Sequence, residues 1–98
     1  MDAEDEIGEQ MHNRDRLRIR NISGETSPLD LVDLFSKKFE VLNVTIHLHG
    51  NNASDLAEAY VTMYKDDARK AKEWANGRYW FDQKLKADLE EDIKRFLG

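Results

Sequence analysis

The stretch Arg16-Leu17-Arg18-Ile19-Arg20-Asn21-Ile22 decides the first element of the fold. Its apolar residues alternate roughly with arginines, which is the pattern of a strand with one buried face and one face toward solvent. The arginines therefore predict an open, positively charged side on this strand.

A helix is predicted directly after this strand. The segment Ser27-Pro28-Leu29-Asp30 places a serine at the cap, a proline at the first helical position and an acid three residues after the cap. Apolar residues then follow at helical spacing, at Leu31, Leu34 and Phe35, so the helix is expected to run to about Lys38.

The rest of the chain predicts three more strands and two more helices. The expected elements are strands at residues 44–48, 57–63 and 85–89, a helix from Asp66 or Asp67 to Asn76-Gly77, and a short amphipathic helix over 89–97. The order is βαββαβ plus a terminal helix. It predicts an α+β fold in which two helices cover one face of a four-stranded antiparallel sheet and leave the other face open.

Length, composition and charge allow one small domain. The chain has 98 residues, and it has no cysteine for a disulfide or a thiolate metal site. Residues 1–10 carry five acids and no Lys or Arg, so residues 11–98 hold fifteen acids and fifteen bases. We expect an acidic disordered leader at 1–14, a domain at 15–90 and a helical extension at 91–98. The neutral body argues weakly against a strong nucleic-acid binder.

In order and spacing, residues 15–90 resemble an RNA-recognition motif (RRM). Residues 17–22 are similar to the first-strand hexamer of that family, and residues 59–63 to the end of its third-strand octamer. RRMs stack bases on aromatic rings of the open sheet face. At the family's ring positions this chain has Arg18, Glu58 and Tyr60, so one ring remains. Arg18 and Glu58 are also expected to form a cross-strand charge pair.

The resemblance implies one possible RNA-binding surface. It would consist of Tyr60 and a stripe of cations on the first and fourth strands, namely Arg18, Arg20, Lys84 and Lys86.

A second feature resembles the splicing-factor homology-motif (UHM) branch of RRMs. Arg78-Tyr79-Trp80-Phe81 is similar to its Arg-x-aromatic loop, although that branch usually has Phe where Trp80 lies. The resemblance implies a basic, Trp-containing peptide bound on the helical side, with Arg78, Tyr79 and Trp80 as contacts and Asp30 and Asp33 as acids. Three consecutive rings cannot all be buried, so at least one is expected to be partly exposed.

No enzymatic or metal-binding pattern is present in the sequence. There is no nucleophile elbow and no phosphate-cradling glycine loop, and His47 and His49 are a sparse metal set. We therefore expect a non-enzymatic module without cofactor, metal, membrane or small-molecule substrate. The resemblance implies nuclear RNA processing, such as pre-mRNA splicing, with a protein partner as the first hypothesis and RNA as the alternative. The same resemblance implies a nuclear location, and from the lack of a signal peptide and of cysteine we expect an intracellular protein.

Overall fold

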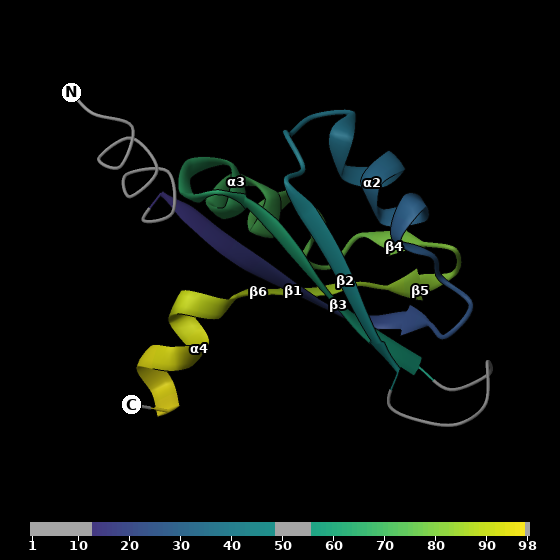
Figure 1. The fold of residues 1–98 in the computed structure, drawn as a ribbon. Helices are drawn as coiled ribbons and strands as arrows, with labels where there is room; N and C mark the ends of the chain where they lie inside the picture. The colour runs from purple at the N-terminus through teal and green to yellow at the C-terminus, as the bar shows by residue number, and fades with distance from the viewer. Residues whose placement is uncertain (1–12, 49–55, 98) are drawn as a thin grey trace.

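The predicted βαββαβ order of the main sheet and its two helices, with a terminal helix after it, is confirmed in a computed structural model, which describes residues 13–48 and 56–97 (Figure 1). The elements are β1 (Arg14–Ser23), α2 (Pro28–Ser36), β2 (Asn43–Leu48), β3 (Leu56–Tyr64), α3 (Lys65–Ala75), β4 (Tyr79–Trp80), β5 (Gln83–Lys84), β6 (Lys86–Leu89) and α4 (Glu90–Leu97).

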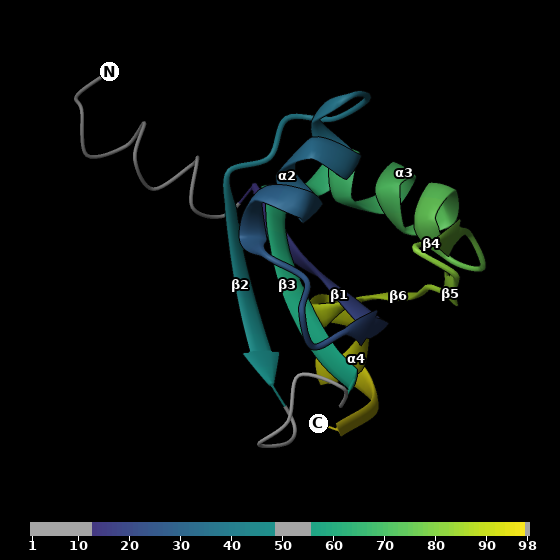
Figure 2. The ribbon, with the colours of Figure 1, turned by 90° about the vertical axis from the view of Figure 1, so that its right-hand side faces the viewer.

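The main sheet has the strand order β2-β3-β1-β6, and all its pairs are antiparallel. Figures 1 and 2 show α2 and α3 together on one side of this sheet, while α4 leaves the end of β6 and extends away from α2. The predicted α+β architecture with one open sheet face is confirmed.

Alternation along the strands builds the core between the sheet and the two helices. β1 turns Leu17, Ile19 and Ile22 inward, and α2 adds Leu31 and Phe35, all at most 1% exposed. Small alanines of α3 allow that helix to approach the sheet closely. The core residues of the other elements are Ala57, Ala59, Val61, Met63, Ala68, Ala71, Ala75, Leu85, Ala87 and Leu89.

A bulge explains why the alternation in β1 is imperfect. The pairing of β1 with β3 shifts between Arg20 and Ile22, and Asn21 between them has φ 67°. Asn21 donates a side-chain hydrogen bond to the carbonyl of Lys84 at 2.8 Å. The extra residue returns Ile22 to the buried face, which strict alternation would have turned outward.

The first helix begins as predicted and ends slightly earlier. The Ser27 hydroxyl accepts a bond from the Asp30 N–H, and the Asp30 carboxylate accepts one from the Ser27 N–H. The helix ends at Ser36 rather than Lys38, and the N–H of Lys38 donates to the carbonyl of Phe35, three residues back, in a 3₁₀-type bond. This tight turn ends the regular helical bonding.

The C-terminal half differs from expectation in its fourth strand. β6 begins at Lys86, and buried Leu85 lies between β6 and a short β4–β5 hairpin that was not predicted. The second helix ends at Ala75, with Asn76 as its cap residue and Gly77 at φ 84° after it, so the predicted stop at Asn76-Gly77 is confirmed. No helix in the described ranges is long and apolar enough to cross a membrane.

Several sequence predictions lie outside the described residues. They concern the leader up to residue 12, His49, the loop at 50–52, and the side chains of Phe96 and Leu97.

Candidate functional site

Tyr60 lies near the centre of the open sheet face. It is half-buried on β3, opposite Arg18 of β1 and Thr45 of β2. The Arg16 guanidinium lies 4.6 Å from the centre of the Tyr60 ring, and the ring of His47 meets its edge at 5.5 Å between centroids. The one ring retained from the family pattern therefore lies between an arginine and a histidine side chain.

β1 presents a row of four arginines to the same face, because Arg14, Arg16, Arg18 and Arg20 occupy every second position. This set is called the arginine row below. β6 supplies Asp88, whose carboxylate lies 3.5 Å from Nη2 of Arg18 and 2.9 Å from Nη2 of Arg20. The row is thus held in place by acids on the neighbouring elements.

The register gives the direct cross-strand neighbours of Glu58 and Arg18. Glu58 lies opposite Arg20, whereas Arg18 lies opposite Tyr60 and directs its guanidinium toward Asp88. The reason is the register of β1 on β3, which the sequence pattern did not determine.

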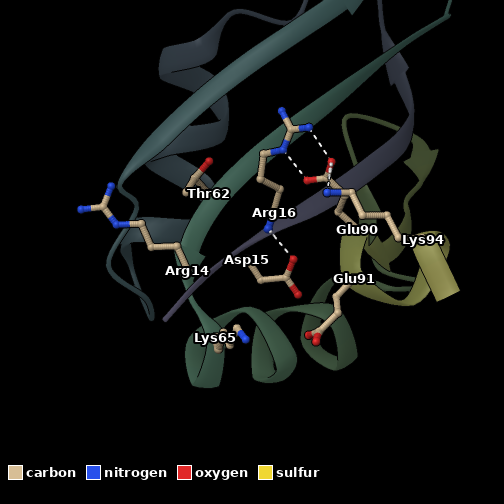
Figure 3. Close-up of a pocket in the computed structure, with 8 residues that line it drawn as sticks. All are labelled: Arg14, Asp15, Arg16, Thr62, Lys65, Glu90, Glu91 and Lys94. Carbon is tan, nitrogen blue, oxygen red and sulfur yellow. Dashed lines mark hydrogen bonds and ion pairs between the residues drawn. The ribbon is translucent and has the colours of Figure 1, made fainter. Parts of the chain in front are cut away.

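Two consecutive residues of β1 hold the start of α4. Arg16 forms a fork with Glu90, donating from Nε and, at 2.6 Å, from Nη2. This hydrogen bond lowers the pKa of Glu90 and raises that of Arg16. Burial raises the pKa of Asp15, although its carboxylate accepts backbone bonds from Arg16 and Glu91 that lower it. The first turn of α4 is therefore anchored to the strand that carries the arginine row (Figure 3).

The predicted cation stripe is only partly assembled. Lys86 lies on β6 opposite Arg20, so it joins the arginine row. Lys84 instead lies on β5, in the small hairpin, where Tyr79 is its partner. Its predicted place on the fourth strand is wrong, because the chain forms the hairpin before it enters the main sheet.

The Arg-x-aromatic segment leads into a hairpin, in which Tyr79 and Trp80 form β4 and the next two residues form the loop. β4 and β5 are joined by Phe81 at φ 49° and Asp82 at φ 63°, the dihedral pattern of a type I′ turn. Trp80 packs partly buried against the core, whereas Tyr79 and Phe81 are 72% and 69% exposed. The prediction that at least one of the three rings is exposed is confirmed.

Arg78 contacts the protein's own tryptophan. Its guanidinium lies 4.1 Å from the centre of the Trp74 ring, and its Nε donates to the Trp74 carbonyl at 3.2 Å. The Trp74 ring in turn meets the edges of Phe35 and Phe39 at 5.6 and 5.8 Å. The chain therefore places its own tryptophan, Trp74, between α2 and α3 and in contact with Arg78.

The two predicted acids have different surroundings. The Asp30 carboxylate caps α2 at Ser27, and Asp33 is exposed on the same helix. Asp30 also lines a shallow hollow of about 310 Å³ together with Phe81 and Glu25. The ring beside Asp30 is thus Phe81, which is not among the binding residues predicted from the sequence.

Sequence reasoning missed Arg14, Arg16, His47, Asp88 and Glu90 as site residues. Counting every second residue outward from Arg18 would have found Arg14 and Arg16. The contact of Glu90 with Arg16 joins residues 74 positions apart, so no local pattern signals it. Within the described ranges, no group of three or more His, Asp or Glu side chains is placed to hold a metal ion.

Comparisons with known proteins find similarity in structure and not in sequence. No protein-family model matches the chain, and no curated protein matches it. The RRM3 domain of Mip6 superposes with a TM-score of 0.71 at 18% identity, covering 76% of this chain and 90% of that one. The C-terminal RNA recognition motif of the U11/U12 65K protein gives 0.64 at 17% identity, covering 74% and 66%.

The RRM of Rna15, solved with bound RNA (GU), gives a TM-score of 0.61 at 14% identity and covers 85% of this chain and 97% of that chain. These similarities agree with the strand order, the two covering helices and the open sheet face described above. The chain has the RNA-recognition-motif fold.

Proposed function

We propose that this chain is a non-enzymatic RRM-type module that binds single-stranded RNA on its open sheet face, in nuclear RNA processing. The single observation that carries the proposal is the arginine row beside Tyr60. Among the described residues of this face, five Arg and Lys side chains lie with three acids. The cations are Arg14, Arg16, Arg18, Arg20 and Lys86; the acids are Glu58, Asp88 and Glu90.

This arrangement suits a single strand for two physical reasons. An aromatic ring on an open sheet is a stacking platform for a base, and arginines beside it neutralise phosphates. The planar guanidinium also matches a phosphate in a forked geometry and can itself stack on a base. Asp88 and Glu90 hold these guanidinium groups in place, so less side-chain freedom is lost on binding.

Fluorescence anisotropy with a labelled, mixed-sequence RNA of ten nucleotides tests the proposal. We expect Tyr60→Ala to weaken binding by about 1–3 kcal/mol, the usual contribution of one base–aromatic stack. Tyr60→Phe should bind as the wild type, because the stacking face remains.

Tyr79→Ala is the matched control, since it removes an equally large ring from the hairpin and leaves the sheet unchanged. If the wild type does not bind this RNA at low salt, or if Tyr60→Ala binds equally well, the proposed function is wrong.

The second candidate is a protein partner at the helical side. One observation favours it: Tyr79 and Phe81 are exposed, and Phe81 lies beside Asp30. Exposed aromatic rings with acids around them suit a basic peptide that carries an aromatic anchor. In this candidate Tyr79, Trp80, Asp30 and Asp33 contact the peptide, and Arg78 supports the hairpin.

Titration with a synthetic basic, Trp-containing peptide separates the two candidates. Binding that is lost in Phe81→Ala or Tyr79→Ala and kept in Tyr60→Ala would favour the partner. RNA binding that is lost in Tyr60→Ala and kept in Phe81→Ala and Tyr79→Ala would favour RNA on the sheet. Stability must be measured alongside, because Trp80→Ala removes a ring that packs against the core.

A further inference from the structure

The register of β1 with β6 places Arg16 beside Glu90. Leu17 pairs with Leu89 across these two strands, so the residue before Leu17 and the residue after Leu89 lie next to each other. Arg16 donates from Nε and, at 2.6 Å, from Nη2 to the two oxygens of the Glu90 carboxylate (Figure 3). Two bonds in the plane of the guanidinium fix its orientation as well as its position.

The fork occupies the edge of the Arg16 guanidinium and does not use its faces. Every N–H of this planar group lies in its plane, so bonds to a carboxylate cover neither face. The guanidinium carbon lies 4.6 Å from the centre of the Tyr60 ring, which is a cation–π contact. The Arg16 side chain is 46% exposed, so this layer over the ring can be reached from solvent.

A base that approaches the Tyr60 ring meets this guanidinium. A base that displaced it would break both charge-assisted bonds to Glu90 and the cation–π contact, in exchange for one base–ring stack. A base that stacks on the guanidinium keeps all three interactions and adds a fourth. Proteins that bind single-stranded RNA stack bases on guanidinium planes as well as on rings. Stacking on Arg16 is therefore favoured over its displacement.

The ion pair also separates the role of Arg16 from that of a phosphate contact. The Glu90 carboxylate offsets the positive charge of Arg16 and occupies two of its donors. A phosphate would have to compete with Glu90 for the same edge of the guanidinium. A base needs only the face, which the fork holds in a fixed plane.

We propose that the Arg16 guanidinium is the surface on which an RNA base stacks, with Tyr60 beneath it and Glu90 as the residue that positions it. The inference rests on the proposed function and specifies which group of the sheet face receives the base. It also gives α4 a part in RNA binding, because Glu90 is the first residue of that helix.

The first test compares the affinity with its salt dependence. Anisotropy titrations of the full chain with the labelled ten-nucleotide RNA give the dissociation constant and the slope of log affinity against log salt concentration. Arg16→Ala should weaken binding about fivefold or more, because one stacking contact is lost. The slope should stay at the wild-type value, whereas the loss of a phosphate contact lowers it by about 0.7. Arg16→Lys should weaken binding as Arg16→Ala does, because it keeps the charge and loses the plane.

The second test depends on the sign of an effect. If charge alone mattered, Glu90→Gln would strengthen binding, because it removes an acid beside a bound polyanion. Positioning predicts the reverse: Glu90→Gln should weaken binding about two- to tenfold, the cost of ordering one freed side chain. In the Arg16→Ala background, Glu90→Gln should weaken binding no further.

Asp92→Asn is the matched control. It removes the same charge from the same helix, but Asp92 lies 3.6 Å from Lys72 of α3 and makes no fork with Arg16. This variant should bind RNA at least as tightly as the wild type. Circular dichroism melts verify that each variant is folded at the titration temperature.

Three results would each overturn the stacking role of Arg16 while the proposed function stands, provided that Tyr60→Ala weakens binding. They are wild-type affinity in Arg16→Lys, a slope that falls by about 0.7 in Arg16→Ala, and tighter binding in Glu90→Gln. Equal weakening in Asp92→Asn and Glu90→Gln would also overturn it, because the effect would belong to α4 in general. If the wild type binds no RNA, both proposals fail.

Discussion

Arg16 is shared between a ring and a helix. Its guanidinium covers Tyr60 at 4.6 Å and is held by the fork to Glu90 at the start of α4. A base that stacks on Tyr60 must therefore displace this guanidinium or stack upon it. This residue links the proposed RNA contact to the position of the terminal helix.

The Arg16–Glu90 pair predicts a loss of stability at acid pH. The folded pKa of Glu90 lies below its ordinary value of 4.5, so the pair stabilises the fold above that pH and is lost as pH falls through the folded pKa. Glu90→Gln should lower the free energy of unfolding by roughly 0.5–1 kcal/mol at pH 7, since Arg16 is 46% exposed. Urea unfolding at pH 7 and pH 3 measures this loss of free energy. An equal loss at both pH values would contradict a stabilising role for the Glu90 charge.

The contribution of Asp15 to stability is expected to change with pH in the opposite direction. Its pKa is raised above 3.8 by burial, so its contribution is present at low pH and is lost as pH rises through the folded pKa. Asp15→Asn keeps an oxygen acceptor for the backbone bond from Glu91 and removes the half-buried charge. We expect a higher melting temperature than the wild type at pH 7 and no gain at pH 3. A lower melting temperature at pH 7 would show that the carboxylate itself is needed.

The hairpin tip holds backbone strain. Asp82 has φ 63°, a conformation that costs L residues free energy and favours glycine. Asp82→Gly should raise the free energy of unfolding by about 0.5–1 kcal/mol in urea titrations. Asp66→Gly is the control, because it places glycine in a regular helix turn and should destabilise by about 1 kcal/mol. A destabilised Asp82→Gly variant would contradict the inferred turn.

At the scale of elements, local signals predicted most of the fold. The capping box at Ser27 and Asp30 set the start of α2, and Asn76-Gly77 set the end of α3. The sequence did not predict the β4–β5 hairpin, because its strands have two residues each and its turn lacks the usual Asn-Gly pair. The sequence did not predict the bulge at Asn21 either, because the bulge is visible only in the pairing of β1 with β3.

The candidate site was predictable only where it depends on alternation. Tyr60 and Arg18 were correctly placed on the open face, because strand periodicity determines the side on which each residue lies. The contacts of Arg16 with Glu90 and of Arg78 with Trp74 depend on tertiary packing. Because Arg78 contacts Trp74 of the same chain, we prefer RNA on the sheet over a peptide on the helices as the proposed ligand.

α4 is expected to stabilise the end of the sheet. It follows β6 directly and contacts β1 through Glu90, while Asp92 lies 3.6 Å from Lys72 of α3. Deletion of residues 90–98 should lower the melting temperature, because the contacts of Glu90 with Arg16 and of Asp92 with Lys72 are lost. An unchanged melting temperature and unchanged sheet amide shifts would mean that α4 adds no stability to the sheet.

At the scale of the whole molecule, charge is unevenly distributed along the chain. Residues 1–12 carry five acids and no Lys or Arg, so a variant without them changes the net charge from −5 to 0. We expect this variant to bind RNA severalfold more tightly at low salt, with the difference disappearing at high salt as screening shortens the repulsion. An equal affinity at low salt would show that these acids do not affect the sheet face.

The most direct test of RNA binding on the sheet is a map of backbone amide shifts during titration with the ten-nucleotide RNA. RNA binding on the sheet predicts that the largest changes fall on β1 and β3 around Tyr60 and the arginine row, with small changes at 79–84. Changes confined to the hairpin and α2, or no changes at all, would contradict it.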